Sequence, residues 1–271
     1  TSCASCHQRM AAFAHLDHQL SHGINGQIGN RNVPPLQNLI FQNSFMWDGG
    51  VNNIEVQPLS PIANPVEMGE DPKAVIEKLK HNKNYVRLFY NAYKDSLINS
   101  ERMLKALAQF TGLMISANSR YDKYLAHKDT FSQEEENGLK LFRSICNNCH
   151  TEPLFTDNSY RNNGLQEDTL LKDIGRMKIS GQPEDRASFR VPSLRNVERT
   201  YPYMHDGRFR NLKQVLDHYG WQTNYHTNVD KSIYHIGKLN ETEKTEIIAF
   251  LKTLTDKDFL YDKRFFNPFV E

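Results

Sequence analysis

Apolar residues recur at intervals of three and four along residues 101–116, which predicts an amphipathic helix. The apolar stripe consists of Met103, Leu104, Leu107, Phe110 and Met114. Ser100 precedes the stripe and is the expected N-cap, because its hydroxyl can accept a hydrogen bond from a free backbone N–H of the first turn. A stripe of this kind is typical of a helix face buried in a hydrophobic core.

Two further stretches combine helical spacing with a recognisable start. Ser132 followed by Glu135 forms a capping box before an apolar pattern that runs directly to Cys146. Near the end of the chain, residues 240–243 are polar and residues 247–254 are apolar at helical spacing, which predicts a closing helix.

Strand-like alternation is scarce, so we expect an all-α fold. Residues 21–72 and 151–202 are rich in Asn, Gly and Pro and predict long loops, which usually line a functional site or wrap a cofactor. A length of 271 residues suits two domains. We place their boundary near residues 126–131, which gives an N-terminal domain at 1–128 and a C-terminal domain at 129–271.

Charge and hydropathy argue against several partners. The chain has 33 Lys and Arg residues against 32 Asp and Glu residues, so no net positive field favours nucleic acid or an anionic membrane surface. No apolar run approaches the roughly 20 residues that a transmembrane helix needs, and no leader with a charged start and an apolar centre is recognisable. We therefore expect a soluble chain without a membrane span or a nucleic-acid partner.

All four cysteines of the chain belong to two copies of the motif Cys-x-x-Cys-His. The copies are Cys3, Cys6 and His7, and Cys146, Cys149 and His150. Their offset of 146 − 3 = 143 residues indicates a duplicated architecture. Two thiols at this spacing can add to the two vinyl groups of one haem, and the adjacent histidine then binds the iron. The two motifs therefore predict two covalently attached c-type haems.

Two other chemistries use cysteine pairs at this spacing. A zinc site needs both motifs to converge on one tetrahedral centre, and a thioredoxin-like redox pair expects a βαβ context that the sequence lacks. Haem is favoured because each motif opens its own helical region and no cysteine is left over. Haem attachment of this kind indicates export to an oxidising compartment such as the periplasm.

Five further blocks accompany these motifs, at residues 31–34, 45–49, 61–68, 189–197 and 201–207. In the order and spacing of all these blocks the chain resembles the bacterial dihaem cytochrome c peroxidase family, including its MauG-like branch. The resemblance covers nearly the whole chain. It implies two cytochrome c-type haem domains whose long loops pack around an inter-domain cleft. It also implies that peroxide binds at the N-terminal haem and that the C-terminal haem takes in electrons.

The resemblance assigns roles to three residues near the peroxide site. Trp47 matches a tryptophan that lies between the two haems and relays an electron; simple packing in a domain interface is the alternative. Glu67 and Gln57 match a distal carboxylate and a distal amide, which would transfer a proton and orient the peroxide.

Two metal-binding features also follow from the resemblance. His22 matches a histidine that caps the peroxide-binding iron at rest in many members, although two other histidines stand close to it in the sequence. Asn32 and the backbone carbonyls of Thr200 and Pro202 match a calcium site between the haems. Oxygen ligands of this kind suit a hard cation.

The sixth ligand of the C-terminal haem sets this chain apart from ordinary members. Those members place a methionine 14 residues after the histidine of a His-Asp-Gly motif, and counting from His205 gives 205 + 14 = 219. Tyr219 stands there, as in the MauG-like branch, where a phenolate ligand stabilises ferric and more oxidised iron. Met204 and His218 are competing ligands, and a purely structural Tyr219 in a helix at 212–219 is the other alternative.

These assignments lead to three candidate functions. The first is a periplasmic peroxidase that reduces hydrogen peroxide to water with electrons from a small redox protein, either a monohaem cytochrome c or a cupredoxin. The second is a MauG-like oxidase that uses peroxide equivalents to oxidise a protein or an organic substrate, which Tyr219 favours. Trp221 is either a surface relay for this reaction or a buried structural anchor. The third is a dihaem electron carrier, against which the pocket at Gln57 and Glu67 argues. Many relatives dimerise, so a homodimer is also considered.

Overall fold

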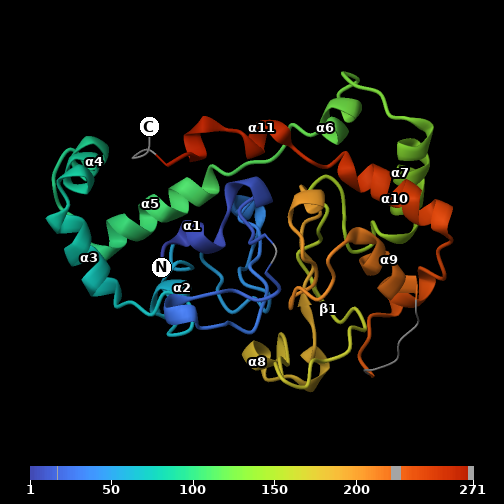
Figure 1. Cartoon of the computed structure of the whole chain (residues 1–271), viewed down its shortest axis with the longest axis horizontal. Helices are drawn as coiled ribbons and strands as arrows, with labels where there is room; N and C mark the ends of the chain where they lie inside the picture. Colours follow the sequence, from blue (N-terminus) through green and yellow to red (C-terminus); the bar gives the residue numbers. More distant parts are fainter. Residues whose placement is uncertain (17, 221–226, 268–271) are drawn as a thin grey trace.

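The computed structural model describes residues 1–16, 18–220 and 227–267. This part of the chain is mostly helical, as the sequence predicts, and contains one small two-stranded sheet. The longer helices lie on the outside of two lobes, and loops occupy the region where the lobes meet (Figure 1). No helix in the described ranges is long and apolar enough to cross a membrane.

The elements follow one another with long connections. The α-helices are α1 (Cys3–Cys6), α2 (Leu59–Ala63), α3 (Pro72–His81), α4 (Lys83–Tyr93), α5 (Ser100–Gly112), α6 (Arg120–Leu125), α7 (Gln133–Ile145), α8 (Met177–Ser180), α9 (Leu212–Gly220), α10 (Glu241–Lys252) and α11 (Lys257–Leu260). The 3-10 helices are η1 (Arg9–Ala11), η2 (Ile24–Gly26), η3 (Leu39–Phe41), η4 (Pro183–Asp185), η5 (Val197–Arg199), η6 (Lys231–His235) and η7 (Lys263–Phe265). Strands β1 (Tyr160–Arg161) and β2 (Phe189–Arg190) pair in antiparallel register.

Helices α7 and α10 begin where the sequence predicts. The Ser132 side chain accepts a hydrogen bond from the backbone N–H of Glu135, and the Glu135 carboxylate accepts one in return from the backbone of Ser132. Asn240 and Glu243 form the same reciprocal box in front of α10. Both predicted starts are confirmed because each box satisfies backbone donors that the first helical turn leaves free.

Among the longer helices, three start differently from the prediction or were missed. The N-cap of α5 is Asn99, whose side chain accepts from the backbone, so the expected cap at Ser100 was wrong by one residue. Helices α3 and α4 were not predicted. The start of α3 is nevertheless recognisable, since Asp71 caps it and Pro72 fills its first position, where no N–H is needed. Asn82 caps α4 in the same way.

Helix α5 also ends earlier than the predicted 101–116 pattern, at Gly112. The side-chain amide of Asn38 donates to the Ser116 backbone oxygen (3.1 Å) and accepts from the Ser116 N–H (2.9 Å). This pairing takes the Ser116 backbone away from the helix. Met114 remains buried, as its place in the apolar stripe predicts, but in a loop.

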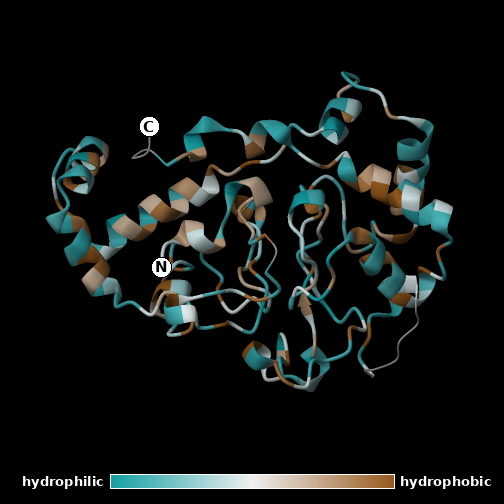
Figure 2. Ribbon diagram, viewed as in Figure 1, coloured by the Kyte–Doolittle hydropathy of each residue, from teal (hydrophilic) through white to brown (hydrophobic). Residues whose placement is uncertain are grey.

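The largest hydrophobic cluster belongs to the lobe that contains α7, α9 and α10. Its buried members are Tyr121, Phe131, Leu139, Phe142, Phe155, Val197, Leu212, Leu216, Leu239, Ile247, Phe250, Leu251 and Leu254. At Gly138 an added Cβ would lie 1.9 Å from the Glu246 backbone oxygen, so glycine permits the close approach of α7 and α10. These helices carry both hydrophobic and hydrophilic residues, as amphipathic elements do (Figure 2).

The other lobe has two smaller clusters. One lies where α3, α4 and α5 meet and consists of Ile62, Ile76, Phe89, Ile98 and Met103. The other combines Ala12, Phe13 and Met114 with Phe259, Leu260 and Phe265 from the last part of the chain. We call residues 1–116 the N-terminal half and 120–256 the C-terminal half. The segment at 257–267 crosses back onto the N-terminal half (Figure 1).

The two halves share a second repeat, in addition to the Cys-x-x-Cys-His motifs. The pattern Val-Pro-x-Leu-x-Asn begins at Val33 and again at Val191, and the pattern Met-x-Asp-Gly begins at Met46 and again at Met204. Both offsets are equal, since 191 − 33 = 158 and 204 − 46 = 158. In both copies the asparagine and the methionine adopt left-handed backbone conformations, with φ of 59° and 58° for the asparagines and 69° and 75° for the methionines.

The halves meet across this repeat in a reciprocal manner. The backbone N–H of Asn32 donates to the His205 oxygen (2.6 Å), and the N–H of Arg190 donates to the Trp47 oxygen (2.8 Å). The two donor residues are 190 − 32 = 158 positions apart, and the two acceptor residues are 205 − 47 = 158 positions apart. Each half therefore donates from one position of the repeat and accepts at the other. Such an exchange is the signature of an approximate two-fold axis.

A buried polar network crosses the same boundary. The Asn196 amide donates to the Gln37 side-chain oxygen (2.8 Å) and to the Ser116 hydroxyl (2.9 Å). The Asn196 side chain accepts in turn from the backbone N–H of Asp256 (2.7 Å). Since an unsatisfied buried polar group is costly, these bonds fix how the halves sit against each other.

Candidate active site

The N-terminal motif places a histidine ready to bind a metal. Helix α1 carries Cys3 and Cys6, and His7 follows directly. The Nδ1 atom of His7 lies 2.6 Å from the Phe13 backbone oxygen, so the proton belongs on Nδ1 and the lone pair on Nε2. Burial lowers the pKa of His7, which favours the neutral imidazole that binds metals.

The C-terminal motif repeats this arrangement. It follows α7, and the Nδ1 atom of His150 lies 3.1 Å from the backbone oxygens of both Phe155 and Pro192. Burial lowers the pKa of His150 as well. Both motifs therefore present a neutral imidazole with its Nε2 directed away from the carbonyl that holds it.

The cysteines are unsuited to zinc or to thioredoxin-like chemistry. All four are free, and burial raises the pKa of Cys146 to about 12 and raises that of Cys149. A redox-active pair needs a lowered pKa. Among the described residues, no group of three or more His, Cys, Asp or Glu side chains is arranged to hold a metal ion.

A buried arginine provides an independent test of the fit to haem. Arg190 is only 6% exposed, and its Nη1 atom has no partner in the described part of the chain. Its Nε atom makes a long contact of 3.4 Å to the Met46 backbone oxygen. A buried charge of this kind is costly unless an anion pairs with it. The propionate carboxylates of a haem are anions of the required kind, so the residues present fit this group.

Glu67 stands in a half-buried position after α2. Its Oε1 atom accepts a hydrogen bond from the Asn64 amide (2.9 Å), and its backbone oxygen accepts one from the N–H of Ile24 (2.6 Å). Burial raises the pKa of Glu67 above its ordinary value. The carboxyl group is therefore suited to exchange protons.

Gln57 stands just before α2, whereas Glu67 follows that helix. The Gln57 Nε2 atom is 3.6 Å from the Met46 sulfur, one residue before Trp47. In the described residues, Gln57 and Glu67 make no hydrogen bond to each other. Their joint role at a peroxide site stays a prediction.

The position of His22 is fixed through its backbone. The Cys6 thiol donates to the His22 oxygen (3.3 Å). The exposed His22 ring lies 4.4 Å from the His18 ring and 6.0 Å from the His15 ring, measured between centroids. His15 is buried, and its Nδ1 atom has no hydrogen-bond partner in the described ranges. The three histidines that compete in sequence are thus neighbours in space, next to the N-terminal motif.

Trp47 lies at the contact between the halves. Its ring is buried, and its indole N–H donates to the Asn32 backbone oxygen (2.8 Å). Its own backbone oxygen accepts from Arg190, and two residues later the Pro192 oxygen faces His150 Nδ1. A short hydrogen-bonded connection therefore runs from the C-terminal histidine to Trp47.

The predicted calcium ligands come from segments that the structure joins. The amide nitrogen of Asn32 donates to the backbone oxygens of His18 (3.3 Å) and Gln19 (3.0 Å), which leaves Oδ1 as the side-chain atom that could face a cation. The backbone of Asn32 is bonded to His205, in the same segment as Thr200 and Pro202. A calcium ion between these groups stays a prediction.

The three candidate sixth ligands of the C-terminal haem gather around Asn163. The Asn163 amide nitrogen lies 3.4 Å from the Tyr219 hydroxyl and 3.5 Å from the Met204 sulfur. His218 Nε2 lies 3.1 Å from the Asn163 backbone oxygen and is thus occupied. Burial raises the pKa of Tyr219 to about 12, and Cys149 and Cys146 add to the increase, so the phenol lies close to the C-terminal motif.

Asn163 and Arg190 were missed as site residues by the sequence reasoning. Asn163 comes from the long loop at 151–202, where nothing in its neighbours sets it apart. Arg190 lies inside one of the blocks that resemble the family, but only its burial shows that it lacks a partner. Trp221 lies outside the described residues.

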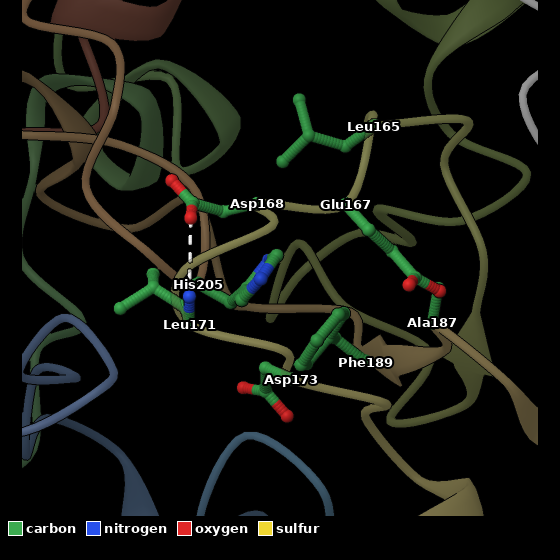
Figure 3. Close-up of a pocket in the computed structure, with 8 residues that line it drawn as sticks. All are labelled: Leu165, Glu167, Asp168, Leu171, Asp173, Ala187, Phe189 and His205. Atoms are coloured by element: carbon green, nitrogen blue, oxygen red, sulfur yellow. Dashed lines mark hydrogen bonds between the residues drawn. The ribbon is translucent and has the colours of Figure 1, made fainter.

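A small cavity has no residue of either haem motif in its lining (Figure 3). Its lining consists of Leu165, Glu167, Asp168, Leu171, Asp173, Ala187, Phe189 and His205. The His205 and Phe189 rings stack with 3.7 Å between centroids, and burial lowers the pKa of His205 to about 4. Asp173 is held by Arg31 through two hydrogen bonds of 2.5 and 2.8 Å. The Arg31–Asp173 ion pair therefore joins the two halves beside the cavity.

Comparisons with known proteins identify the family. The family model for di-haem cytochrome c peroxidase matches residues 1–130. Cytochrome c551 peroxidase of Nitrosomonas europaea is 32% identical over 259 residues, which cover 94% of this chain and 74% of that protein. The methylamine utilization protein MauG of Methylorubrum extorquens is 31% identical over 267 residues, with coverages of 93% and 72%.

Solved structures share the whole fold. A MauG-like protein associated with microbial copper homeostasis has a TM-score of 0.91 and 28% identity, and the match covers 100% of this chain and 88% of that one. The diheme peroxidase BthA of Burkholderia thailandensis, with a TM-score of 0.79 and 22% identity over 96% of this chain and 82% of that one, shares the fold. From the identity and coverage of these relatives, the chain belongs to the dihaem cytochrome c peroxidase family and is a peroxidase-type oxidoreductase, for which the family implies two c-type haems.

Proposed function

We propose that this protein reduces hydrogen peroxide to water in the periplasm, with electrons that enter at the C-terminal haem and pass to the N-terminal haem. Each peroxide takes up two electrons and two protons and gives two water molecules. The bound haems would supply the irons that store electrons and cleave the peroxide. The electron donor would be a small redox protein, either a monohaem cytochrome c or a cupredoxin.

The proposal depends most on the paired histidine arrangement. His7 and His150 each follow a cysteine pair, and each has Nδ1 facing a backbone carbonyl. Cys3 and Cys6 would hold one haem. Cys146 and Cys149 would hold the other. Arg190 would pair with a haem propionate, which would offset the cost of its unpaired buried charge.

Glu67 is the residue that we propose for proton transfer. Its raised pKa lets it take the proton from the near oxygen of peroxide and return it to the leaving oxygen. The hydrogen bond from Asn64 holds the carboxyl in one orientation while the proton moves. Gln57 would orient the peroxide through its amide.

Trp47 is the residue that we propose as the relay between the haems. Support comes from its burial at the boundary and from the connection through Arg190 and Pro192 to His150. His22 would act as a gate at the N-terminal haem, because its backbone oxygen lies 3.3 Å from the Cys6 sulfur, next to the residues that would hold that haem. A calcium ion at Asn32, Thr200 and Pro202 would brace the same boundary.

A MauG-like oxidation of a protein or an organic substrate is the second candidate. The observation that favours it is the position of the Tyr219 hydroxyl, which lies 3.4 Å from the Asn163 amide nitrogen and close to Cys146 and Cys149. A phenolate is a hard, anionic ligand that disfavours reduction of the iron it binds. Such a site would store oxidising equivalents in place of taking electrons from a donor.

A rapid-mixing experiment separates the candidates. Fully oxidised and half-reduced samples of the haem-loaded protein are each mixed with one equivalent of peroxide and followed by optical and EPR spectroscopy. Reaction of the half-reduced sample alone supports the gated peroxidase. Direct reaction of the oxidised sample, with a long-lived oxidised species, supports the MauG-like function. If neither sample reacts, both enzyme proposals fail and the electron carrier remains.

A further inference from the structure

Each half places a side-chain amide against the sulfur of its turn methionine. Gln57 Nε2 lies 3.6 Å from Met46 Sδ, and Asn163 Nδ2 lies 3.5 Å from Met204 Sδ. The two methionines correspond through the 158-residue repeat, and both have left-handed backbones. The two amides do not correspond, since 163 − 158 = 5 and residue 5 is a serine. The same arrangement is therefore built twice from different parts of the chain.

The two arrangements differ in what else the amide reaches. In the described residues, the Gln57 amide nitrogen contacts only the Met46 sulfur. The Asn163 amide nitrogen also lies 3.4 Å from the Tyr219 hydroxyl. An amide nitrogen has two protons, so it can donate to the sulfur and the oxygen together. Of these acceptors, a phenolate oxygen is much the stronger.

Asn163 is itself held in place on two sides. Its side-chain oxygen accepts from the backbone N–H of Leu165 (3.3 Å), which directs the amide nitrogen toward Met204 and Tyr219. Its backbone oxygen faces His218 Nε2 on the neighbouring position of α9 (3.1 Å). The loop and the helix that bears Tyr219 are thus joined through this one residue.

We propose that Asn163 is a positioning residue that donates a hydrogen bond to the Tyr219 phenol oxygen and so sets its strength as a ligand of the C-terminal haem. At the N-terminal haem, Gln57 makes the equivalent contact with a methionine sulfur, and its amide remains available to bind peroxide. The inference rests on the proposed ligand role of Tyr219. A donor at the phenolate oxygen draws electron density away from the iron and makes the ferric state easier to reduce.

The test compares Asn163→Leu with the wild type in the haem-loaded protein. Leucine has similar size and no donor, so the phenolate should bind the iron more strongly. The phenolate-to-iron charge-transfer band should move to longer wavelength, and the midpoint potential of the C-terminal haem should fall. Gln166→Leu is the matched control, because it removes an exposed amide from the same loop.

Two further variants separate this inference from the assignment of Tyr219. Tyr219→Phe should abolish the charge-transfer band, and in that background Asn163→Leu should leave the potential unchanged because the amide acts through the phenol. A wild-type protein that lacks the band refutes the Tyr219 assignment and the inference with it. If the band is present but Asn163→Leu matches Gln166→Leu, or raises the potential, only the role of Asn163 is refuted.

Discussion

The two halves of this protein share a scaffold and differ in the residues that surround each haem motif. Each half has a cysteine pair, a histidine held by a backbone carbonyl, and a turn methionine in contact with an amide. Beyond that shared frame, the N-terminal half adds Glu67 and the C-terminal half adds Tyr219. Duplication thus accounts for the repeated cysteine and histidine motif and for the boundary between the halves, while a loop adds Glu67, the proposed proton carrier, and helix α9 adds Tyr219, the proposed ligand.

The largest effect should come from removing one haem at a time. We expect Cys3→Ser with Cys6→Ser to lose one haem and nearly all reaction with peroxide, because the site beside Glu67 then has no iron. The corresponding pair at Cys146 and Cys149 should also lose one haem but keep direct binding of peroxide at the other. Intact mass and optical spectra count the haems. Equal loss of peroxide binding in both pairs would contradict the division of roles.

Glu67→Gln should be the next most damaging change. Loss of a general acid–base group costs typically about 10²–10⁴-fold in rate, and we expect a fall of that size in peroxide turnover. Glu70→Gln, three residues along and paired with Lys78, is the control and should stay near the wild type.

The pH profile gives a second reading of Glu67. The carboxylate form must accept a proton, so wild-type turnover should fall as the pH drops through the raised pKa, above the ordinary value of about 4.3. Glu67→Gln should lack this acidic limb. A limb that persists in the variant would assign the titration to another group.

The next prediction concerns stability and not turnover, and tests the polar network between the halves. Asn196→Ala removes bonds to Gln37 and Ser116 and forces alanine into a left-handed backbone, so we expect a loss of about 2–4 kcal/mol in the free energy of unfolding. Asn25→Ala is the control, since Asn25 is exposed but also left-handed, with φ of 55°. Urea unfolding of both variants measures the difference. Equal losses would mean that backbone strain, and not the network, explains the effect.

Local signals predicted the parts of the fold that depend on neighbouring residues. The capping box at Ser132 and the polar start at residues 240–243 gave two helix starts correctly, because the interacting groups are only three residues apart. The end of α5 was misjudged because it depends on Asn38, 78 residues away from Ser116. The 158-residue repeat could have been found in the sequence, since both of its patterns recur at one offset.

The residues of the candidate site also fall into those that local sequence signals identify and those that only long-range contacts identify. The haem motifs could be recognised from residue type and spacing alone, and the resemblance added Trp47, Glu67 and Tyr219. Asn163 and Arg190 could not be found, because their significance lies in contacts and burial that no spacing encodes. Long-range pairing was therefore the part that required the structure.

The electron path through Trp47 is the central claim, and one measurement tests it most directly. Half-reduced, haem-loaded protein is mixed with one equivalent of peroxide, and oxidation of the C-terminal haem is followed for the wild type and Trp47→Phe. We predict that the variant keeps both haems but slows this oxidation at least about tenfold, or ~1.4 kcal/mol in barrier height. Phe41→Leu, which alters an exposed aromatic residue of the same half, should have no effect. An unchanged rate in Trp47→Phe, with both haems present, would contradict the account.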